Sequence, residues 1–378
     1  MIINNVKLVL ENEVVSGSLE VQNGEIRAFA ESQSRLPEAM DGEGGWLLPG
    51  LIELHTDNLD KFFTPRPKVD WPAHSAMSSH DALMVASGIT TVLDAVAIGD
   101  VRDGGDRLEN LEKMINAIEE TQKRGVNRAE HRLHLRCELP HHTTLPLFEK
   151  LVQREPVPLV SLMDHSPGQR QFANREKYRE YYQGKYSLTD AQMQQYEEEQ
   201  LALAARWSQP NRESIAALCR ARKIALASHD DATHAQVAES HQLGSVIAEF
   251  PTTFEAAEAS RKHGMNVLMG APNIVRGGSH SGNVAASELA QLGLLDILSS
   301  DYYPASLLDA AFRVADDESN RFTLPQAVKL VTKNPAQALN LQDRGVIGEG
   351  KRADLVLAHR KGNHIHIDHV WRQGKRVF

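Results

Sequence analysis

The stretch LLPGLIELHTDNLDKFF, residues 47–63, is the part of the sequence that decides the fold. A Pro-Gly pair precedes a short apolar run that ends at His55, and Asp57 follows two residues later. Residues two apart on a strand point to the same side. We therefore interpret residues 51–57 as a buried strand whose end directs an imidazole and a carboxylate to one point.

Segments of the same kind recur through the middle of the chain, separated by helical stretches such as 107–124 and 210–222. Repeated alternation of strand and helix, about eight times, is typical of a (β/α)8 TIM-type barrel. An open doubly wound sheet is the main alternative. The strands that we predict lie at 51–57, 89–96, 132–139, 157–165, 224–230, 244–250, 265–270 and 294–301.

Both ends of the chain are rich in strand-forming residues, with Asn, Gly and Ser at the turns between them. We expect residues 1–48 and 346–378 to form one small β-sandwich domain. The barrel would then take residues 49–345, with a lid-like insert at about 166–210.

The overall composition limits the function classes. The net charge of −9 argues against a nucleic-acid binder, which needs a basic surface. The two cysteines, Cys137 and Cys219, form no CxxC pair, so neither a disulfide framework nor a cysteine zinc site is expected. No apolar run is long enough to span a membrane, and the N-terminus lacks the layout of a signal peptide. We expect a cytoplasmic protein.

Candidate metal ligands stand at the ends of several predicted strands, which is where the active site of a (β/α)8 barrel lies. A lone histidine is more often a surface or core residue, but six such residues at strand ends are hard to explain in that way. The mixture of imidazole and carboxylate suits zinc, manganese or iron. The six candidates are His55, Asp57, Glu138, His165, His229 and Asp301.

On these residues the chain resembles the amidohydrolase superfamily of metal-dependent hydrolases. The matching segments are PGLIELHTD, the residues Glu138, His165 and His229, SSD ending at Asp301, and NPAQALNLQDRGVIGEGKRADLVL. A closer resemblance, to diphosphatases of phosphonate metabolism, is carried by HTDNLDKF, RCELPH, LVSLMDHSPGQRQF and SSDYYPASLL.

The resemblance implies two divalent metal ions, with Glu138 in the bridging place that a carboxylated lysine holds in many relatives. It also implies that Asp301 both binds metal and moves a proton. The substrate would be a small polyphosphorylated ribosyl phosphonate, cleaved to the 5-phosphate and diphosphate. Asp57 stands where most relatives have a second histidine, and its extra negative charge favours a harder ion such as manganese.

A polyphosphate substrate needs cations besides the metal ions. Residues 166–186 read as a lid rich in Lys, Arg and Tyr, and residues 276–283 (RGGSHSGN) as a loop whose N–H groups can approach an anion. The plainer alternatives are a solvated amphipathic helix and a flexible connection. The phosphate-binding candidates are Lys61, Arg66, Arg170, Lys177, Arg276 and His280.

Two other functions compete with the diphosphatase. One is an amidase or deaminase of the same superfamily, acting on a cyclic amide or a nucleobase-like substrate. The other is a non-enzymatic scaffold on the same fold, against which the full ligand set argues. The sequence does not determine the oligomeric state, and a homo-oligomer is compatible with it.

Overall fold

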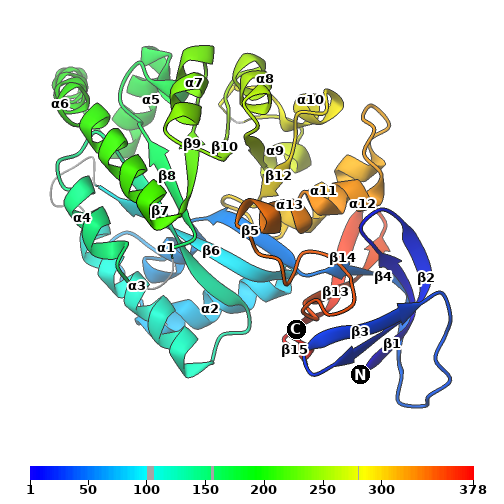
Figure 1. Ribbon diagram of the computed structural model, residues 1–378. Coiled ribbons are helices and arrows are strands. Elements are labelled where there is room, and N and C mark those ends of the chain that lie inside the picture. Colours follow the sequence, from blue (N-terminus) through cyan, green and yellow to red (C-terminus); the bar gives the residue numbers. More distant parts are fainter. Residues whose placement is uncertain (100–105, 155–156, 280) are drawn as a thin grey trace. The chain divides into compact units, whose positions relative to one another are not determined.

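The computed structural model describes residues 1–99, 106–154, 157–279 and 281–378 (Figure 1). All of the predicted barrel strands are present, and they form one sheet of eight strands in the order β12-β11-β10-β9-β8-β7-β6-β5. A bridge between Thr56 and Asp301 joins the first strand to the segment after the last, so the sheet is a barrel rather than an open doubly wound sheet. The strands are β5 (Leu51–Thr56), β6 (Ile89–Ile98), β7 (Glu130–Glu138), β8 (Leu159–Met163), β9 (Ala225–His229), β10 (Ile247–Glu249), β11 (Asn266–Gly270) and β12 (Ile297–Ser299).

Strand β5 is buried along its whole length, as expected for a strand of a parallel sheet that is covered on both faces. Gly50, just before it, permits a close backbone approach, because an added Cβ would lie 2.1 Å from Thr90 Oγ1. The Gly50 N–H donates to the carbonyl of Asp354, 2.7 Å away. The Pro-Gly pair thus marks the point where the chain leaves the terminal sheet and enters the barrel.

The two ends of the chain form a second sheet of seven strands, in the order β15-β14-β13-β4-β1-β2-β3, and both termini lie in it (Figure 1). Its apolar side chains, among them Leu8, Leu47 and Trp371, form one buried cluster. One sheet built from both termini is therefore confirmed, while the exact domain boundaries stay a prediction. The strands are β1 (Ile2–Val9), β2 (Val14–Gln22), β3 (Glu25–Ala30), β4 (Met40–Pro49), β13 (Leu355–Lys361), β14 (His364–Arg372) and β15 (Lys375–Arg376).

Helices follow most barrel strands. They are α1 (Asn58–Phe63), α2 (Ala73–Ala86), α3 (Asp106–Arg124), α4 (Thr144–Leu151), α5 (Arg175–Tyr186), α6 (Asp190–Arg222), α7 (His234–Gln242), α8 (Phe254–Lys262), α9 (Ala271–Arg276), α10 (Ala286–Gln291), α11 (Ser306–Asp316), α12 (Leu324–Lys329) and α13 (Lys333–Ala338). A short 3-10 turn, Arg170–Phe172, precedes α5. Among the described residues, no helix is long and apolar enough to cross a membrane.

The chain divides into two compact units. Unit 1 comprises Met1–Asp94, Asn116–Arg132 and Met269–Phe378, and unit 2 comprises Ala95–Ile115 and Leu133–Leu268. Each unit carries part of the predicted ligand set, and the two sets are described separately below.

Candidate metal centre

In unit 1, His55 and Asp301 lie close together at the seam of the barrel. His55 is the penultimate residue of β5 and is almost fully buried, and its Nε2 lies 3.9 Å from Asp301 Oδ1. The Asp301 N–H donates to the His55 carbonyl at 3.2 Å, and Asp301 has a left-handed φ of 53°. Asp is one of the residues that tolerate this conformation. The two predicted ligands are therefore held together by their own backbones.

A buried carboxylate, Glu53, supports this pair. Its Oε1 accepts the His55 N–H at 2.9 Å and its Oε2 accepts the Ser300 N–H at 2.7 Å. Burial raises the pKa of Glu53 to about 7, although the N–H donors oppose that rise. Glu53 thus fixes the backbone at His55 and next to Asp301. Glu53 is not among the ligands predicted from the sequence, although its place two residues before His55, on the same side of the strand, was a signal.

Asp57 lies outside β5, which ends one residue earlier than predicted. It is the N-terminal flanking residue of α1, with φ of −106°, and it is partly buried. The direction of the Asp57 side chain is therefore not determined by the alternation of side chains along a strand. Its role as a metal ligand stays a prediction.

Lys61, on α1, is anchored beside Asp301. Its Nζ donates to the Tyr302 carbonyl at 3.2 Å and contacts Asn58 Oδ1 at 3.4 Å. Asn58 in turn donates to Thr56 Oγ1 at 2.7 Å and to the Asp301 carbonyl at 3.2 Å. Lys61 remains exposed, so its charge can reach a solute. Arg66, in the loop after α1, is also exposed.

In unit 2, Glu138 at the end of β7 holds His165, which follows β8. Glu138 Oε1 accepts the His165 N–H at 2.9 Å, and Oε2 lies 2.7 Å from Nδ1 of the ring. Burial raises the pKa of Glu138, but the charge and hydrogen bonds of His165 outweigh this and lower it. Both carboxylate oxygens of Glu138 thus contact His165.

His165 and His229 converge on Asp230, which is not among the ligands predicted from the sequence. Asp230 Oδ2 lies 3.2 Å from His229 Nε2 and 3.7 Å from His165 Nε2. One ligand atom from each of the three residues falls within 4.8 Å of the others. Burial lowers the pKa of His229, but the charge of Asp230 and the hydrogen bonds with Asp230 and Glu249 raise it to about 10. The same negative surroundings that hold a proton here favour a metal cation.

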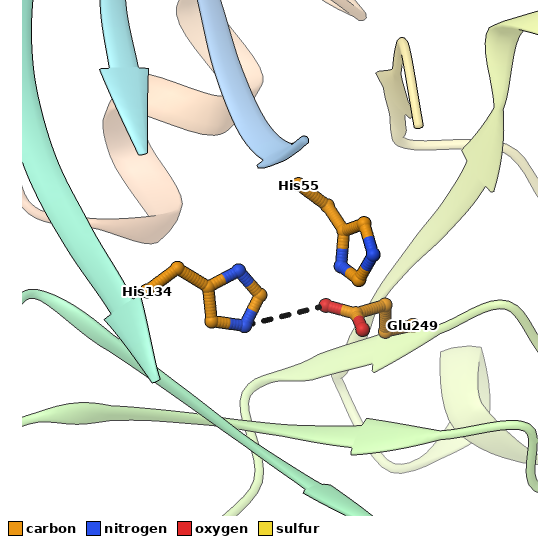
Figure 2. A group of neighbouring side chains, drawn as sticks. All are labelled: His55, His134 and Glu249. Atoms are coloured by element: carbon orange, nitrogen blue, oxygen red, sulfur yellow. Dashed lines mark ion pairs between the residues drawn. The ribbon is translucent and has the colours of Figure 1, made fainter. Parts of the chain in front are cut away.

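Glu249 orients His229 from the neighbouring strand. The two residues are register partners in the parallel pairing of β9 and β10, and His229 Nδ1 lies 2.6 Å from Glu249 Oε1. Figure 2 shows the other side of this carboxylate, where Oε2 lies 3.8 Å from Nε2 of His134 on β7. A carboxylate on the second ring nitrogen fixes the tautomer of a metal-binding histidine. Glu249 is suited to that role for His229.

We expect the Glu249→Gln substitution to weaken metal binding about 10- to 100-fold, because the amide no longer orients the imidazole as a carboxylate does. A competition titration with a chromogenic chelator measures this change. Glu239→Gln is the matched control, since Glu239 lies in the same unit but pairs with Arg212 at 3.3 Å and is half-buried. Equal affinities in the two variants would contradict the role of Glu249.

The cations of the predicted lid are mostly engaged within unit 2. Arg170 is buried, and its Nε donates to Asp231 at 3.1 Å. Arg175 and Arg179 both contact the buried carboxylate of Glu197, at 2.6 and 2.5 Å. Three tyrosines of α5, Tyr178, Tyr182 and Tyr186, pack with Phe172, Met193 and Tyr196 in an apolar cluster. The segment therefore carries an aromatic cluster, and three of its arginines pair with the acidic residues Glu197 and Asp231 outside it.

The remaining phosphate-binding candidates are two exposed side chains and one residue that the structure does not describe. Lys177 on α5 and Arg276 at the end of α9 are exposed. His280 lies outside the described residues. The chemistry of the residues that the structure brings together, imidazole nitrogens and carboxylate oxygens in buried groups, fits divalent metal ions.

Comparison with known proteins identifies the relatives of the chain. An Escherichia coli (strain K12) protein named alpha-D-ribose 1-methylphosphonate 5-triphosphate diphosphatase is 99% identical over 378 residues, which are 100% of both chains. Among solved structures, an amidohydrolase is 15% identical, with a TM-score of 0.64 and coverage of 99% of this chain and 98% of that one. A 5-methylcytosine deaminase from Klebsiella pneumoniae is 16% identical, with a TM-score of 0.57 and coverage of 100% and 98%.

These structural likenesses extend to the fold alone, since their sequence identity is low. A family model described as "Amidohydrolase family" matches residues 82–378, which is well over half of the sequence. The chain therefore belongs to the amidohydrolase family.

Proposed function

We propose that the chain hydrolyses alpha-D-ribose 1-methylphosphonate 5-triphosphate to the corresponding 5-phosphate and diphosphate. The observation that carries this proposal is the full-length relative of 99% identity that bears the name of this activity. The reaction breaks the bridge between the α and β phosphates. The ligand groups of the two units support a hydrolase of this kind.

We further propose two divalent ions, zinc, manganese or iron. One would be held by His165, His229 and Asp230, and the other by His55 together with Asp57 and Asp301. Glu138 would belong to the first of these groups. A bound divalent ion supplies positive charge that activates water and stabilises the charge on phosphate oxygens.

Asp301 is the proposed proton acceptor for the attacking water. Its side chain keeps 32% of its surface exposed, whereas the side chain of His55 keeps 2%. A water molecule can therefore reach the carboxylate of Asp301, while the buried imidazole stays fixed. The diphosphate leaves as a stable anion, so the chain need not supply a strong acid.

Phosphorus-31 NMR of the metal-loaded protein with the triphosphate tests the proposal. We expect diphosphate and the 5-phosphate to appear in equal amounts, and a chelator to stop the reaction. Turnover of a cyclic amide without any release of diphosphate would overturn the proposal in favour of the amidase alternative.

Lys61 is the cation best placed in unit 1 to bind the phosphate chain. We expect Lys61→Ala to raise KM about tenfold, because a charge-assisted hydrogen bond contributes about 1.5 kcal/mol. Steady-state kinetics at fixed metal concentration measures this change. Lys361→Ala is the control, since Lys361 is exposed at the end of β13. An unchanged KM in Lys61→Ala would remove Lys61 from substrate binding.

A further inference from the structure

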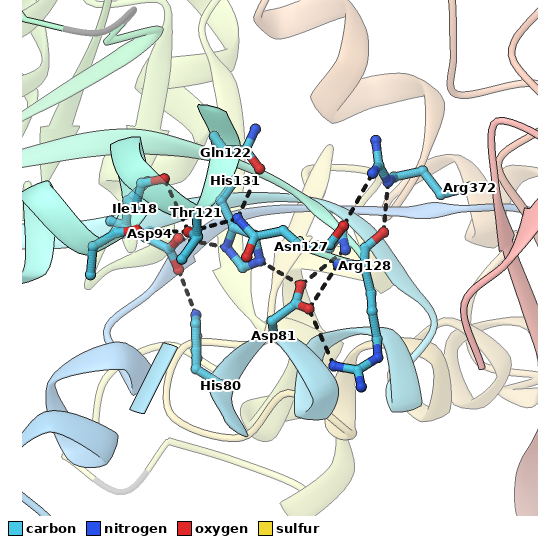
Figure 3. Close-up of polar contacts among 12 residues, drawn as sticks. His80, Asp81, Asp94, Ile118, Thr121, Gln122, Asn127, Arg128, His131 and Arg372 are labelled. Carbon is cyan, nitrogen blue, oxygen red and sulfur yellow. Dashed lines mark hydrogen bonds and ion pairs between the residues drawn. The ribbon is translucent and has the colours of Figure 1, made fainter. Parts of the chain in front are cut away.

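Unit 1 also holds a second cluster of histidine and aspartate, made of residues other than the ligands described above; Figure 3 shows it. His131, at the start of β7, has a carboxylate on each ring nitrogen. Its Nδ1 lies 2.7 Å from Asp94 Oδ2, and its Nε2 lies 2.9 Å from Asp81 Oδ1. The other oxygen of Asp94, Oδ1, lies 2.6 Å from Nε2 of His80. All four side chains are almost completely buried.

The hydrogen-bond geometry fixes the protons of this cluster. Asp81 accepts the backbone N–H groups of Arg128 at 2.8 Å and Ala129 at 3.0 Å, which favour its ionised form. Ionised carboxylates only accept hydrogen bonds, so both nitrogens of His131 must donate. His131 is therefore an imidazolium between two carboxylates. Burial opposes that charge, but Asp94 and Asp81 outweigh burial and raise the pKa of His131 from 6.5 to about 9.

The groups around His131 come from several elements. Helix α2 supplies His80 and Asp81, and β6 supplies Asp94. The Arg128 guanidinium lies 3.6 Å from Asp81 Oδ2. Arg372 of β14 donates to the carbonyls of Arg128, at 2.6 Å, and of residue 127, at 3.2 Å. The protonated ring of His131 thus connects helix α2, strands β6 and β7, and the loop at Arg128 through hydrogen bonds.

The cluster reaches the end of strand β5 in two ways. Asp94 is the register partner of Thr56 in the parallel pairing of β5 and β6, and Thr56 lies between the predicted ligands His55 and Asp57. The ring of His80 also packs against Phe62 of α1, with centroids 5.8 Å apart. A movement of Asp94 would therefore shift Thr56, just before Asp57, and a movement of His80 would shift Phe62, which follows Asp57 on α1.

We propose that His131, held as an imidazolium, is a positioning residue that fixes the end of β5 through Asp94 and His80. It touches no substrate and acts only on the backbone that carries His55 and Asp57. Its importance for catalysis rests on the proposed function, whereas its effect on β5 does not.

The proposal has a pH dependence of defined sign. The folded chain holds this proton more tightly than the unfolded chain does. The stabilisation is therefore complete below about pH 6.5 and is lost as the pH rises through about 9. The order of β5 should fall over the same interval.

Hydrogen–deuterium exchange of the metal-free protein, read by mass spectrometry, tests the proposal. We expect His131→Gln to lose protection at least tenfold in a peptide covering residues 51–57, and to keep it in residues 355–361 of β13. Asp81→Asn should show a smaller loss in the same peptide. His74→Gln is the control, because His74 pairs with Glu120 at 3.1 Å on the exposed surface.

The wild-type protein provides a test that needs no variant. After correction for the pH dependence of the intrinsic exchange rate, the peptide covering β5 should lose protection between pH 7 and pH 9.5. The peptide covering β13 should keep its protection over the same interval. Equal losses in both peptides would show a merely global effect and overturn the proposal. The alternative is that the cluster binds a metal ion. If metal analysis found one ion fewer in His131→Gln than in the wild-type protein, with the protection of β5 unchanged, the cluster would be a metal site and the proposal would be overturned.

Because these exchange experiments require no turnover, they separate this proposal from the proposed function. An inactive protein with the expected exchange pattern would leave the role of His131 intact and reject the diphosphatase. In active protein, we expect His131→Gln to weaken metal binding about tenfold while KM for the triphosphate at saturating metal is unchanged.

Discussion

Asp301→Asn should lower kcat about 10²- to 10⁴-fold and leave the bound metal largely in place. The amide keeps the size and the backbone contacts of Asp301, including the N–H donated to the His55 carbonyl at 3.2 Å. It cannot accept a proton from water at neutral pH. Catalysis therefore loses its proton acceptor, whereas the site keeps its shape.

Steady-state kinetics together with metal analysis of the same preparation measures both effects. Asp309→Asn is a suitable control, because Asp309 pairs with Arg313 on α11 at 3.3 Å and is not among the proposed ligands. A variant at position 301 that keeps wild-type kcat would remove Asp301 from the proton transfer.

Glu53→Ala is expected to have the second large effect. The substitution leaves the N–H groups of His55 and Ser300 without their acceptors inside a closed barrel. Unsatisfied buried donors cost about 1–3 kcal/mol each, so the free energy of unfolding should fall by at least that amount. Because Glu53 fixes His55, metal affinity should also fall, about 10- to 100-fold.

Urea unfolding and a chelator titration separate the two consequences. Glu130→Ala is the matched control, since Glu130 bonds Arg344 at 2.5 Å and Arg352 at 3.1 Å at the start of β7. We expect it to lose stability but to keep its metal affinity. If both variants lost affinity equally, the loss would report general loosening and not the support of His55.

The fold could be predicted from the sequence because its signals are local. Each barrel strand is a short apolar run, and candidate ligands stand where several of those runs end. The candidates His55, Glu138, His165 and His229 were selected in this way, and the two terminal segments that share a sheet were recognised by their strand-forming residues. The structure places each of these four at the end of its strand or just after it.

The missed residues depend on geometry that a strand pattern does not contain. Asp230 follows His229 directly, and alternation would turn it to the opposite face. Its left-handed φ of 56° breaks the alternation and brings its carboxylate to His229. Glu249 acts through the register of β9 and β10, which the sequence does not determine.

The charges of residues 166–186 show the limit of a local pattern, because their acidic partners lie elsewhere in the sequence. Lys and Arg residues near a predicted site suggested free cations for a phosphate chain. Glu197 on α6 engages both Arg175 and Arg179, and Asp231 engages Arg170. Acidic partners 18 to 61 residues away in the sequence could not be foreseen from the charge run alone.

The bridge between Thr56 and Asp301 has a consequence for how the chain matures. The contact joins segments that are far apart in the sequence, as the bond between Asn58 and Asp301, 243 residues apart, illustrates. Pairings of this kind form slowly because a long loop must close first. The proposed proton acceptor reaches His55 only when the last strand meets the first. We therefore expect a refolding chain to gain activity only when the barrel closes. The onset of turnover during refolding would then report the time at which the last strand meets the first.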